Sequence, residues 1–281
     1  MLPSALPAPG PGHRGTALTD STATEGLFAG VDVGASTAKA VVIDASGTVL
    51  GQDVRPSGMD FTESGHGALD AALAAAGHAR DELTACIATG YGRNNVPAAT
   101  GTRTEIAAHG RGAYHHHPHA LTVVDVGGQD NKIIKLDEDG KRTGFRMNRK
   151  CAAGTGAFLE EISARLSVGL DELNELARQS TQRLPLNSFC TVFASTEVLS
   201  RIRAGESRPD LARGIFAAVV ARVAEAEVLT PPVMATGGVA AHNPVFLELL
   251  EEAVGAAILV PPDPQTIGAL GAALIARDER T

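Results

Sequence analysis

The sequence repeats one order of predicted elements in its two halves, and this repeat limits the possible folds more than any other feature. The first copy has three strands, a helix and a further strand, predicted at residues 27–34, 37–44, 47–51, 67–79 and 83–88. The second copy opens with three more strands, predicted at 120–126, 132–136 and 142–147. Hairpin turns between strands, followed by helices, indicate an α/β protein built from a duplicated unit. Such a unit usually binds its ligand in the cleft between the copies.

The rest of the second copy is predicted to consist mainly of helices. Helices are expected at 156–166, 169–178, 212–228, 244–253 and 265–276, and strands at 232–236 and 257–260. After Cys190, Ser195 is expected to cap a short helix that ends at Gly205.

These elements divide the chain into a first half at 27–118 and a second half at 119–263. Residues 264–281 are expected to form a C-terminal helix that packs back on the first half. Residues 1–26 are rich in proline, glycine, serine and threonine and lack a periodic apolar pattern, so we expect a disordered tail there.

Composition and charge exclude several classes of partner. The 281 residues are 44% hydrophobic, which fits a soluble protein with two cores, and the formal net charge is −8. An acidic chain offers no basic face to nucleic acid or to an anionic membrane. No apolar run is long enough to predict a membrane span. Three cysteines do not make a disulfide framework in a chain of this length, which indicates a reducing cytoplasm.

Two glycine-containing hairpins follow strands that end in aspartate. The first runs from Asp32 to Lys39 and the second from Asp125 to Lys132. Backbone amides of such turns can face a phosphate, and the carboxylates can hold water bound to Mg²⁺. Either hairpin alone is more often only a hairpin, but two at equivalent places can clamp a triphosphate from both sides. The expected nucleotide-binding residues are Gly34, Ala35, Ser36, Thr37, Lys39, Gly127 and Gly128.

A third glycine turn, at Gly237 and Gly238, follows an aliphatic strand and precedes a helix. Its bare backbone can approach a nucleoside closely, although a tight strand-to-helix turn is an equally good interpretation. No Walker A loop and no Rossmann glycine motif occurs in the chain.

The candidate catalytic residues are Asp32, Asp125 and Gln129. The two aspartates are expected to hold Mg²⁺-bound water or to position the attacking water, and Gln129 to orient that water. The sequence does not divide these roles among them. Lys39 and Lys132 can meet phosphate, but a lysine after a turn is more often solvated.

Two groups of histidines have simpler interpretations. Glu105 and His109 have the spacing of neighbours on one helix face, which favours a hydrogen-bonded pair over a metal site. The run His115–His119 is interpreted as a solvated connection between the halves, although it can also capture metal ions adventitiously.

The cysteines suggest a redox or metal function. Cys86 lies in an apolar run suited to burial, whereas Cys151 and Cys190 lie among small or hydroxyl residues. A cubane iron–sulfur cluster needs four thiolates, so two chains would have to share one cluster if these two cysteines are ligands. Amide donors of the helix after Cys151 would then stabilise the thiolates. From spacing alone, the alternative is a buried Cys151 in a tight turn and a Cys190 in the core.

Several segments together resemble the actin, Hsp70 and sugar-kinase ATPase superfamily, and within it the 2-hydroxyacyl-CoA dehydratase activator (component A) and benzoyl-CoA reductase ATPase-subunit family. The resemblance covers residues 28–276 and rests on Gly30–Gly34, Thr89–Arg93, Asp125–Asp130, Lys150–Gly156 with Phe158–Glu160, Cys190–Ala194 and Pro264–Gly271. The Cys-Ala-Ala-Gly-Thr-Gly segment is highly specific.

The resemblance implies two RNase H-like domains with ATP or ADP and Mg²⁺ in the cleft between them. It implies a homodimer with one [4Fe–4S] cluster at its interface, held by Cys151 and Cys190 of each chain. Ferredoxin or flavodoxin would reduce this cytoplasmic, oxygen-sensitive protein. It would then transfer a low-potential electron to a dehydratase or reductase partner while hydrolysing ATP.

Two other functions remain possible from the sequence. A small-molecule kinase of the same superfamily, acting for example on an amino sugar, would use the cleft but not the cysteine pair. A non-redox, nucleotide-dependent regulator would keep the fold and lose electron transfer, although Asp32, Asp125 and Gln129 argue against it.

Overall fold

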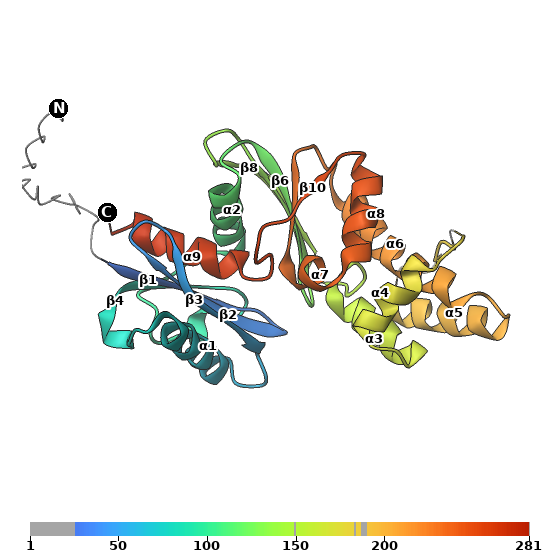
Figure 1. Cartoon of the computed structure of the whole chain (residues 1–281), viewed down its shortest axis with the longest axis horizontal. Coiled ribbons are helices and arrows are strands. Elements are labelled where there is room, and N and C mark those ends of the chain that lie inside the picture. Colours follow the sequence, from blue (N-terminus) through green and yellow to red (C-terminus); the bar gives the residue numbers. More distant parts are fainter. Residues whose placement is uncertain (1–25, 149, 183, 187–189, 281) are drawn as a thin grey trace, which may run out of the picture.

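Two five-stranded mixed sheets form the centre of the molecule (Figure 1). The structure is a computed structural model, and it describes residues 26–148, 150–182, 184–186 and 190–280. The tail predicted at 1–26 therefore lies, apart from Gly26, outside the described residues. The strand orders are β3-β2-β1-β4-β5 and β10-β9-β6-β7-β8, so the second sheet has the arrangement of the first.

The first sheet consists of β1 (Leu27–Val33), β2 (Thr37–Asp44), β3 (Val49–Pro56), β4 (Leu83–Thr89) and β5 (Gly101–Thr102). Strands β1 to β3 form an antiparallel meander, and β4 joins β1 in parallel. All residues of β1 are buried because helices cover both faces of the sheet.

The second sheet consists of β6 (Leu121–Val126), β7 (Asn131–Leu136), β8 (Arg142–Asn148), β9 (Val233–Thr236) and β10 (Ile258–Leu259). Strands β6 to β8 are antiparallel, and β9 joins β6 in parallel, as β4 joins β1. Strand β8 forms one edge and is largely exposed.

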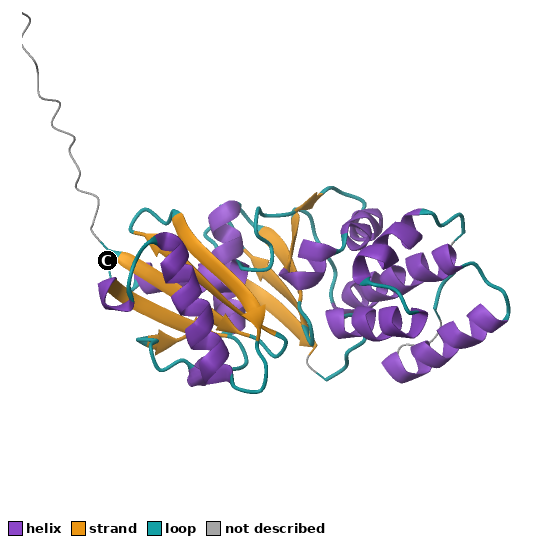
Figure 2. Cartoon of the chain, turned by 60° about the horizontal axis from the view of Figure 1, so that its bottom comes forward, coloured by secondary structure: helices purple, strands orange, loops and turns teal. Residues whose placement is uncertain are grey.

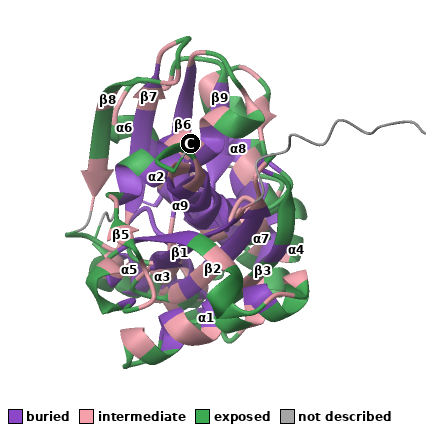
Figure 3. Ribbon diagram, turned by 90° about the vertical axis from the view of Figure 1, so that its left-hand side faces the viewer, coloured by how far each residue is buried: buried purple, intermediate pink, exposed green. Residues whose placement is uncertain are grey.

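Two helices fill the space between the sheets. Helix α2 (Glu105–His116) contacts β6, β7 and β8, and helix α9 (Ile267–Asp278) contacts α2, β1, β2 and β4. Figure 3 shows α9 as the most enclosed helix, between the two sheets. Apolar side chains of both sheets and both helices form one continuous core there, so the two halves share their packing.

The outer faces of the sheets carry different helices. Helix α1 (Phe61–Ala76) covers the first sheet, with the short 3₁₀ turns η1 (Arg80–Glu82) and η2 (Arg93–Asn95) beside it. Helices α6 (Arg208–Ala226), α7 (Gly237–His242) and α8 (Pro244–Val254) contact strands of the second sheet. Helices α3 (Gly156–Leu166), α4 (Leu170–Arg178) and α5 (Thr191–Arg203) pack on one another and on this layer. Of these, α3 to α6 form a helical lobe at one end of the molecule (Figure 2). No helix in the described ranges is long and apolar enough to cross a membrane.

Three details of the structure differ from the sequence prediction. Helix α1 begins at Phe61 because Asp60 caps it, with its carboxylate accepting from the amides of Thr62 and Glu63. Ser195 is not a cap: α5 already begins at Thr191, and the Ser195 hydroxyl donates to a carbonyl one turn earlier. The strand pair β4–β5 was not predicted, because β5 has only two residues.

Candidate functional site

A cavity of about 810 Å³ opens between the two halves. Every residue predicted to bind nucleotide or to act in its hydrolysis lines this cavity, namely Asp32, Gly34, Ala35, Ser36, Thr37, Lys39, Asp125, Gly127, Gly128, Gln129, Gly237 and Gly238. The structure thus brings together side chains and turns from β1, β2, β6, β7 and β9. Cys151 and Cys190 are not among the lining residues.

The two glycine hairpins face one another across the cavity and touch at their tips. A Cβ atom built on Gly128 would lie 2.4 Å from the Ser36 hydroxyl oxygen and 2.8 Å from the Ser36 Cβ, so a larger residue there would force Ser36 to move. Each hairpin is closed by the same backbone bond, from Gly34 to the Thr37 carbonyl at 3.0 Å and from Gly127 to the Asp130 carbonyl at 2.9 Å. The two turns therefore repeat in geometry as well as in sequence.

An aspartate and a lysine form an ion pair at the base of each hairpin. In the antiparallel register Asp32 lies opposite Lys39, and Asp125 lies opposite Lys132. Directly opposed residues share one face of a sheet, so both side chains of each pair point into the cleft. The Lys39 Nζ to Asp32 Oδ2 distance is 3.3 Å, and the Lys132 Nζ to Asp125 Oδ2 distance is 3.0 Å.

The neighbouring parallel strand places a threonine and a glycine beside each aspartate. Thr89 is opposite Asp32, and Thr236 is opposite Asp125. The next residue is a glycine with positive φ in both halves, +89° at Gly90 and +90° at Gly237. A Cβ on either would come within 2.4 Å of the backbone oxygen of Val33 or Val126, respectively.

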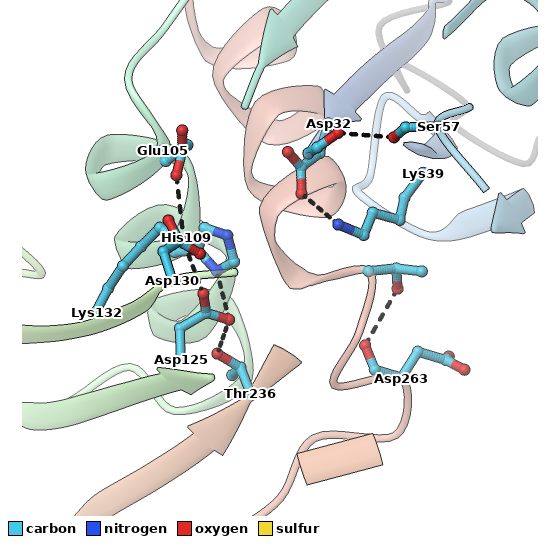
Figure 4. A network of polar contacts seen from close by, with 12 residues as sticks. Asp32, Lys39, Ser57, Glu105, His109, Asp125, Asp130, Lys132, Thr236 and Asp263 are labelled. Atoms are coloured by element: carbon cyan, nitrogen blue, oxygen red, sulfur yellow. Dashed lines mark hydrogen bonds and ion pairs between the residues drawn. The ribbon is translucent and has the colours of Figure 1, made fainter. Parts of the chain in front are cut away.

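The second aspartate lies in a larger polar network (Figure 4). Lys132 contacts Asp130 at 3.0 Å and Glu105 at 3.3 Å as well as Asp125. Thr236 Oγ1 donates to Asp125 Oδ1 at 3.0 Å. The Nδ1 atom of His109 lies 3.3 Å from the same oxygen, although not in hydrogen-bond geometry.

The network keeps both members of the second ion pair charged. Burial alone would raise the pKa of the Asp125 carboxyl, but the charges of His109 and Lys132 and the hydrogen bonds from Lys132 and Thr236 hold that pKa well below its usual range. Burial would lower the pKa of the Lys132 ammonium, but the carboxylates of Asp125, Asp130 and Glu105 raise it. The lysine is thus a fixed buried cation.

The prediction that a lysine at this position is solvated is therefore wrong for Lys132. The sequence favours Glu105 and His109 as a hydrogen-bonded pair, whereas α2 brings them to Lys132 and Asp125 respectively. One sequence signal could have revealed the ion pairs: aspartate and lysine are separated by seven residues in each hairpin.

The three cysteines lie in different environments. Cys86 is buried in β4, and burial raises the pKa of its thiol to about 12. Cys151 and Cys190 are both exposed, so the alternative that they are buried core thiols is wrong. No group of three or more potential metal-ligating side chains occurs within the part of the chain that the structure describes.

The two exposed cysteines precede helices that contact one another. Cys151 lies before α3, and Cys190 is the N-cap of α5. The first turn of α5 also exposes Val192 and Phe193. The sequence predicts that the first amides of α3 stabilise the Cys151 thiolate, but the amides of Gly156 and Ala157 donate instead to the carbonyls of Gly127 and Gly128 at 2.9 and 2.7 Å.

Comparison with known proteins identifies relatives of this chain. Residues 29–276 match the model of the BadF/BadG/BcrA/BcrD ATPase family. The chain is 40% identical to the activator of lactoyl-CoA dehydratase of Anaerotignum propionicum, over 88% of this chain and 96% of the relative.

Two solved structures are similar over almost the whole described chain. Component A of the Acidaminococcus fermentans (R)-2-hydroxyglutaryl-CoA dehydratase has 36% identity and a TM-score of 0.85, covering 90% of this chain and 98% of the other. The activator of the 2-hydroxyisocaproyl-CoA dehydratase from Clostridium difficile, with bound ADPNP, has 34% identity and a TM-score of 0.84, covering 90% and 95%. The predicted fold class, a duplicated α/β fold of the actin, Hsp70 and sugar-kinase type, is confirmed.

Proposed function

This chain belongs to the BadF/BadG/BcrA/BcrD ATPase family, and we propose that it is an ATP-hydrolysing iron–sulfur activator. Its partner would be a 2-hydroxyacyl-CoA dehydratase or a related acyl-CoA reductase, to which it transfers a low-potential electron. The observation that carries the nucleotide part is the pair of Asp–Lys hairpins that face each other across one cavity. Relatives at 34–40% identity that are named as dehydratase activators support the choice of partner.

The hairpin turns would hold the phosphates of ATP and ADP. Because the amides of Gly34 and Gly127 already close the hairpins, the amides from Ala35 to Thr37 and that of Gly128, together with Lys39, would supply donors on two sides of the cavity. The bare turn at Gly237 and Gly238 leaves room for the nucleoside at the start of α7. This arrangement suits a triphosphate whose terminal phosphate lies between the hairpins.

The surroundings of the aspartates suggest a division of roles. Asp125 is already compensated by Lys132 and Thr236, so it would act mainly by fixing the second hairpin. Among the described residues, Lys39 is the one cation paired with Asp32, which leaves carboxylate lone pairs available for water bound to Mg²⁺. Gln129 is exposed at the cavity wall, where it would orient the attacking water.

The cysteine residues fit an iron–sulfur cluster shared between two chains. Each chain offers two exposed thiols, and a two-fold axis would supply the four that a [4Fe–4S] cluster needs. Val192 and Phe193 expose apolar surface beside Cys190, as expected of a contact between copies. When bound, such a cluster would supply a single electron at low potential. The chain's own residues would bind it and limit its exposure to water.

Ferredoxin or flavodoxin would be the electron donor, in a reducing cytoplasm. The acidic net charge argues against nucleic acid as a partner.

Anaerobic purification followed by iron and sulfide analysis tests the redox part. We expect about four irons per dimer, lost in Cys151→Ser and Cys190→Ser but retained in the matched control Cys86→Ser. In the same preparations, Asp32→Asn should keep its iron and lose about 100-fold or more of the ATP hydrolysis rate.

Each part of the proposal can fail separately. A colourless, iron-free anaerobic protein that phosphorylates a sugar would support a kinase instead. Full iron with no ATP hydrolysis would contradict the nucleotide part alone.

A further inference from the structure

Two asparagines that face each other across β7 and β8 hold the two ends of the segment Cys151–Gly154, named here the cysteine loop. Asn131 begins β7, Asn148 ends β8, and the register pairs them directly. Asn148 Nδ2 donates to the Cys151 carbonyl at 2.9 Å, and its Oδ1 accepts from the Cys151 amide at 3.3 Å. Asn131 Nδ2 donates to the Gly154 carbonyl at 2.9 Å.

The contact between Asn131 and Gly154 is buried and closely fitted. Asn131 is 3% exposed, and the hydrogen bond itself is buried. Gly154 has φ +81°, and a Cβ there would lie 2.7 Å from Arg222 Cβ and 3.1 Å from Asn131 Nδ2. The loop carbonyl therefore has little freedom to move unless Asn131 moves with it.

Asn131 is also the residue that directly follows the second hairpin, whose turn Gly127–Asp130 lines the cavity. Asn148, although it lies opposite Asn131, is not next to the hairpin in sequence, because it ends β8. One asparagine thus joins the cysteine loop to the cavity wall, and the other only anchors the loop to the sheet edge.

Peptide geometry links the same hairpin to α3. The carbonyl of Gly127 shares a planar peptide group with the amide of Gly128, and in a trans peptide the two point in opposite directions. These carbonyls of Gly127 and Gly128 accept from the first amides of α3, at 2.9 and 2.7 Å. A phosphate that accepts hydrogen bonds from the amides of the same two peptide groups, those of Gly128 and Gln129, would therefore rotate the two carbonyls that hold the start of α3.

We propose that Asn131 is a positioning residue that transmits the state of the nucleotide in the cavity to the cysteine loop. The proposal rests on nucleotide binding between the hairpins, as described under the proposed function, and it does not depend on a bound cluster. Of the bonds that join hairpin and loop, the one from Asn131 is made by a side chain, so substitution can remove it alone.

Thiol labelling of the full-length chain tests the coupling. In a Cys190→Ser background, Cys151 is the exposed thiol, and the buried Cys86 stays unreactive. We expect the labelling rate of Cys151 by DTNB to differ by about 5-fold or more between saturating ADP and saturating ADPNP, both with Mg²⁺. Asn131→Ala should bring this ratio close to one.

Asn148→Ala is the matched control. It removes the hydrogen bonds that Asn148 makes to Cys151, so we expect faster labelling with both nucleotides. The ratio of the two labelling rates should stay unchanged. Asn131→Asp, which keeps the volume but removes the donor, should behave like Asn131→Ala. Neither asparagine lines the cavity, so the affinity for ADP, measured by calorimetry, should stay within about twofold in all variants.

Three results would overturn the coupling: equal rates with the two nucleotides in the parent, a retained ratio in Asn131→Ala, or the same loss of ratio in Asn148→Ala. Failure to bind either nucleotide would contradict the proposed ATPase function as well, and calorimetry separates that outcome from bound nucleotide without coupling. Iron content is measured independently of both.

Discussion

The two Asp–Lys hairpins have the same register but different surroundings. Lys39 and Asp32 form a simple pair whose lysine side chain is 13% exposed, whereas the Lys132 side chain is 5% exposed and contacts three carboxylates. The hydroxyl of Thr236 bonds to its aspartate, while the equivalent hydroxyl of Thr89 is buried without a hydrogen-bond partner in the described part of the chain.

This contrast shows that the two copies of the Asp–Lys hairpin can have different roles. The first hairpin keeps its polar groups available to a ligand. The second uses its groups to hold α2, β9 and the start of α3 in place. Substitutions made in equivalent positions can therefore separate ligand binding from structural support.

The largest difference is expected for the lysines. Lys132→Met would leave three partly or fully buried carboxylates without their common cation and should lower the free energy of unfolding by about 3–5 kcal/mol. Lys39→Met removes a single contact at the cavity and should cost about 1–2 kcal/mol. Urea unfolding without nucleotide measures both values. Equal losses of unfolding free energy would mean that the two ion pairs contribute equally to stability.

The glycines after β4 and β9 should instead behave alike. Gly90→Ala and Gly237→Ala each place a Cβ 2.4 Å from a backbone oxygen at positive φ, so each should cost about 2–4 kcal/mol. Gly144→Ala is the control, because nothing lies within 4 Å of a Cβ at that position. A clear inequality between Gly90 and Gly237 in urea unfolding would break the geometric equivalence of the halves.

The threonines should differ by a smaller amount. Thr236→Val removes a hydrogen bond to a buried carboxylate and should cost about 2 kcal/mol. Thr89→Val removes a buried hydroxyl that has no recorded partner and should be close to neutral. Thermal unfolding of the two variants in parallel checks this, and similar losses would show that Thr89 has a partner in solution.

The smallest effect is expected from pH. The pKa of Asp125 in the folded chain lies below its usual value of 3.8, so the stability it contributes is present above that pH and is lost as the pH falls below it. Between pH 4 and pH 3, the wild type should lose up to about 1.4 kcal/mol more than Asp125→Asn. If the free energy of unfolding falls equally with pH in the two proteins between pH 4 and pH 3, the electrostatic account of the Asp125–Lys132 pair is contradicted.

Sequence reasoning was successful where the relevant information is local. The residues from Gly34 to Thr37 and the turns at Gly127 and Gly237 are predicted to face one cleft because strand, turn and small residues follow one another along the chain, and all of them line the cavity. The burial of Lys132 does not follow from local sequence, because Glu105 contacts Lys132, and His109 lies beside its partner Asp125, from a helix that lies earlier in the sequence.

Local signals also failed at element boundaries. The sequence pattern does not mark Asp60 as the cap of α1, and it predicts Ser195 as a cap because serine favours that position, although Thr191 already begins the helix. The hydrogen bond from Asn131 to the Gly154 carbonyl joins residues 23 positions apart, and no local sequence motif predicts it.

Helix α9 has a consequence for the synthesis of the protein. It is the last helix of the described chain, yet it packs on β1, β2 and β4, which are made first. While the ribosome translates the second half, the inner face of the first sheet therefore lacks its cover and exposes apolar strands to other chains and to chaperones. A stop codon before Ile267 would remove α9, and we expect it to leave the inner face of the first sheet uncovered and to direct the polypeptide to degradation.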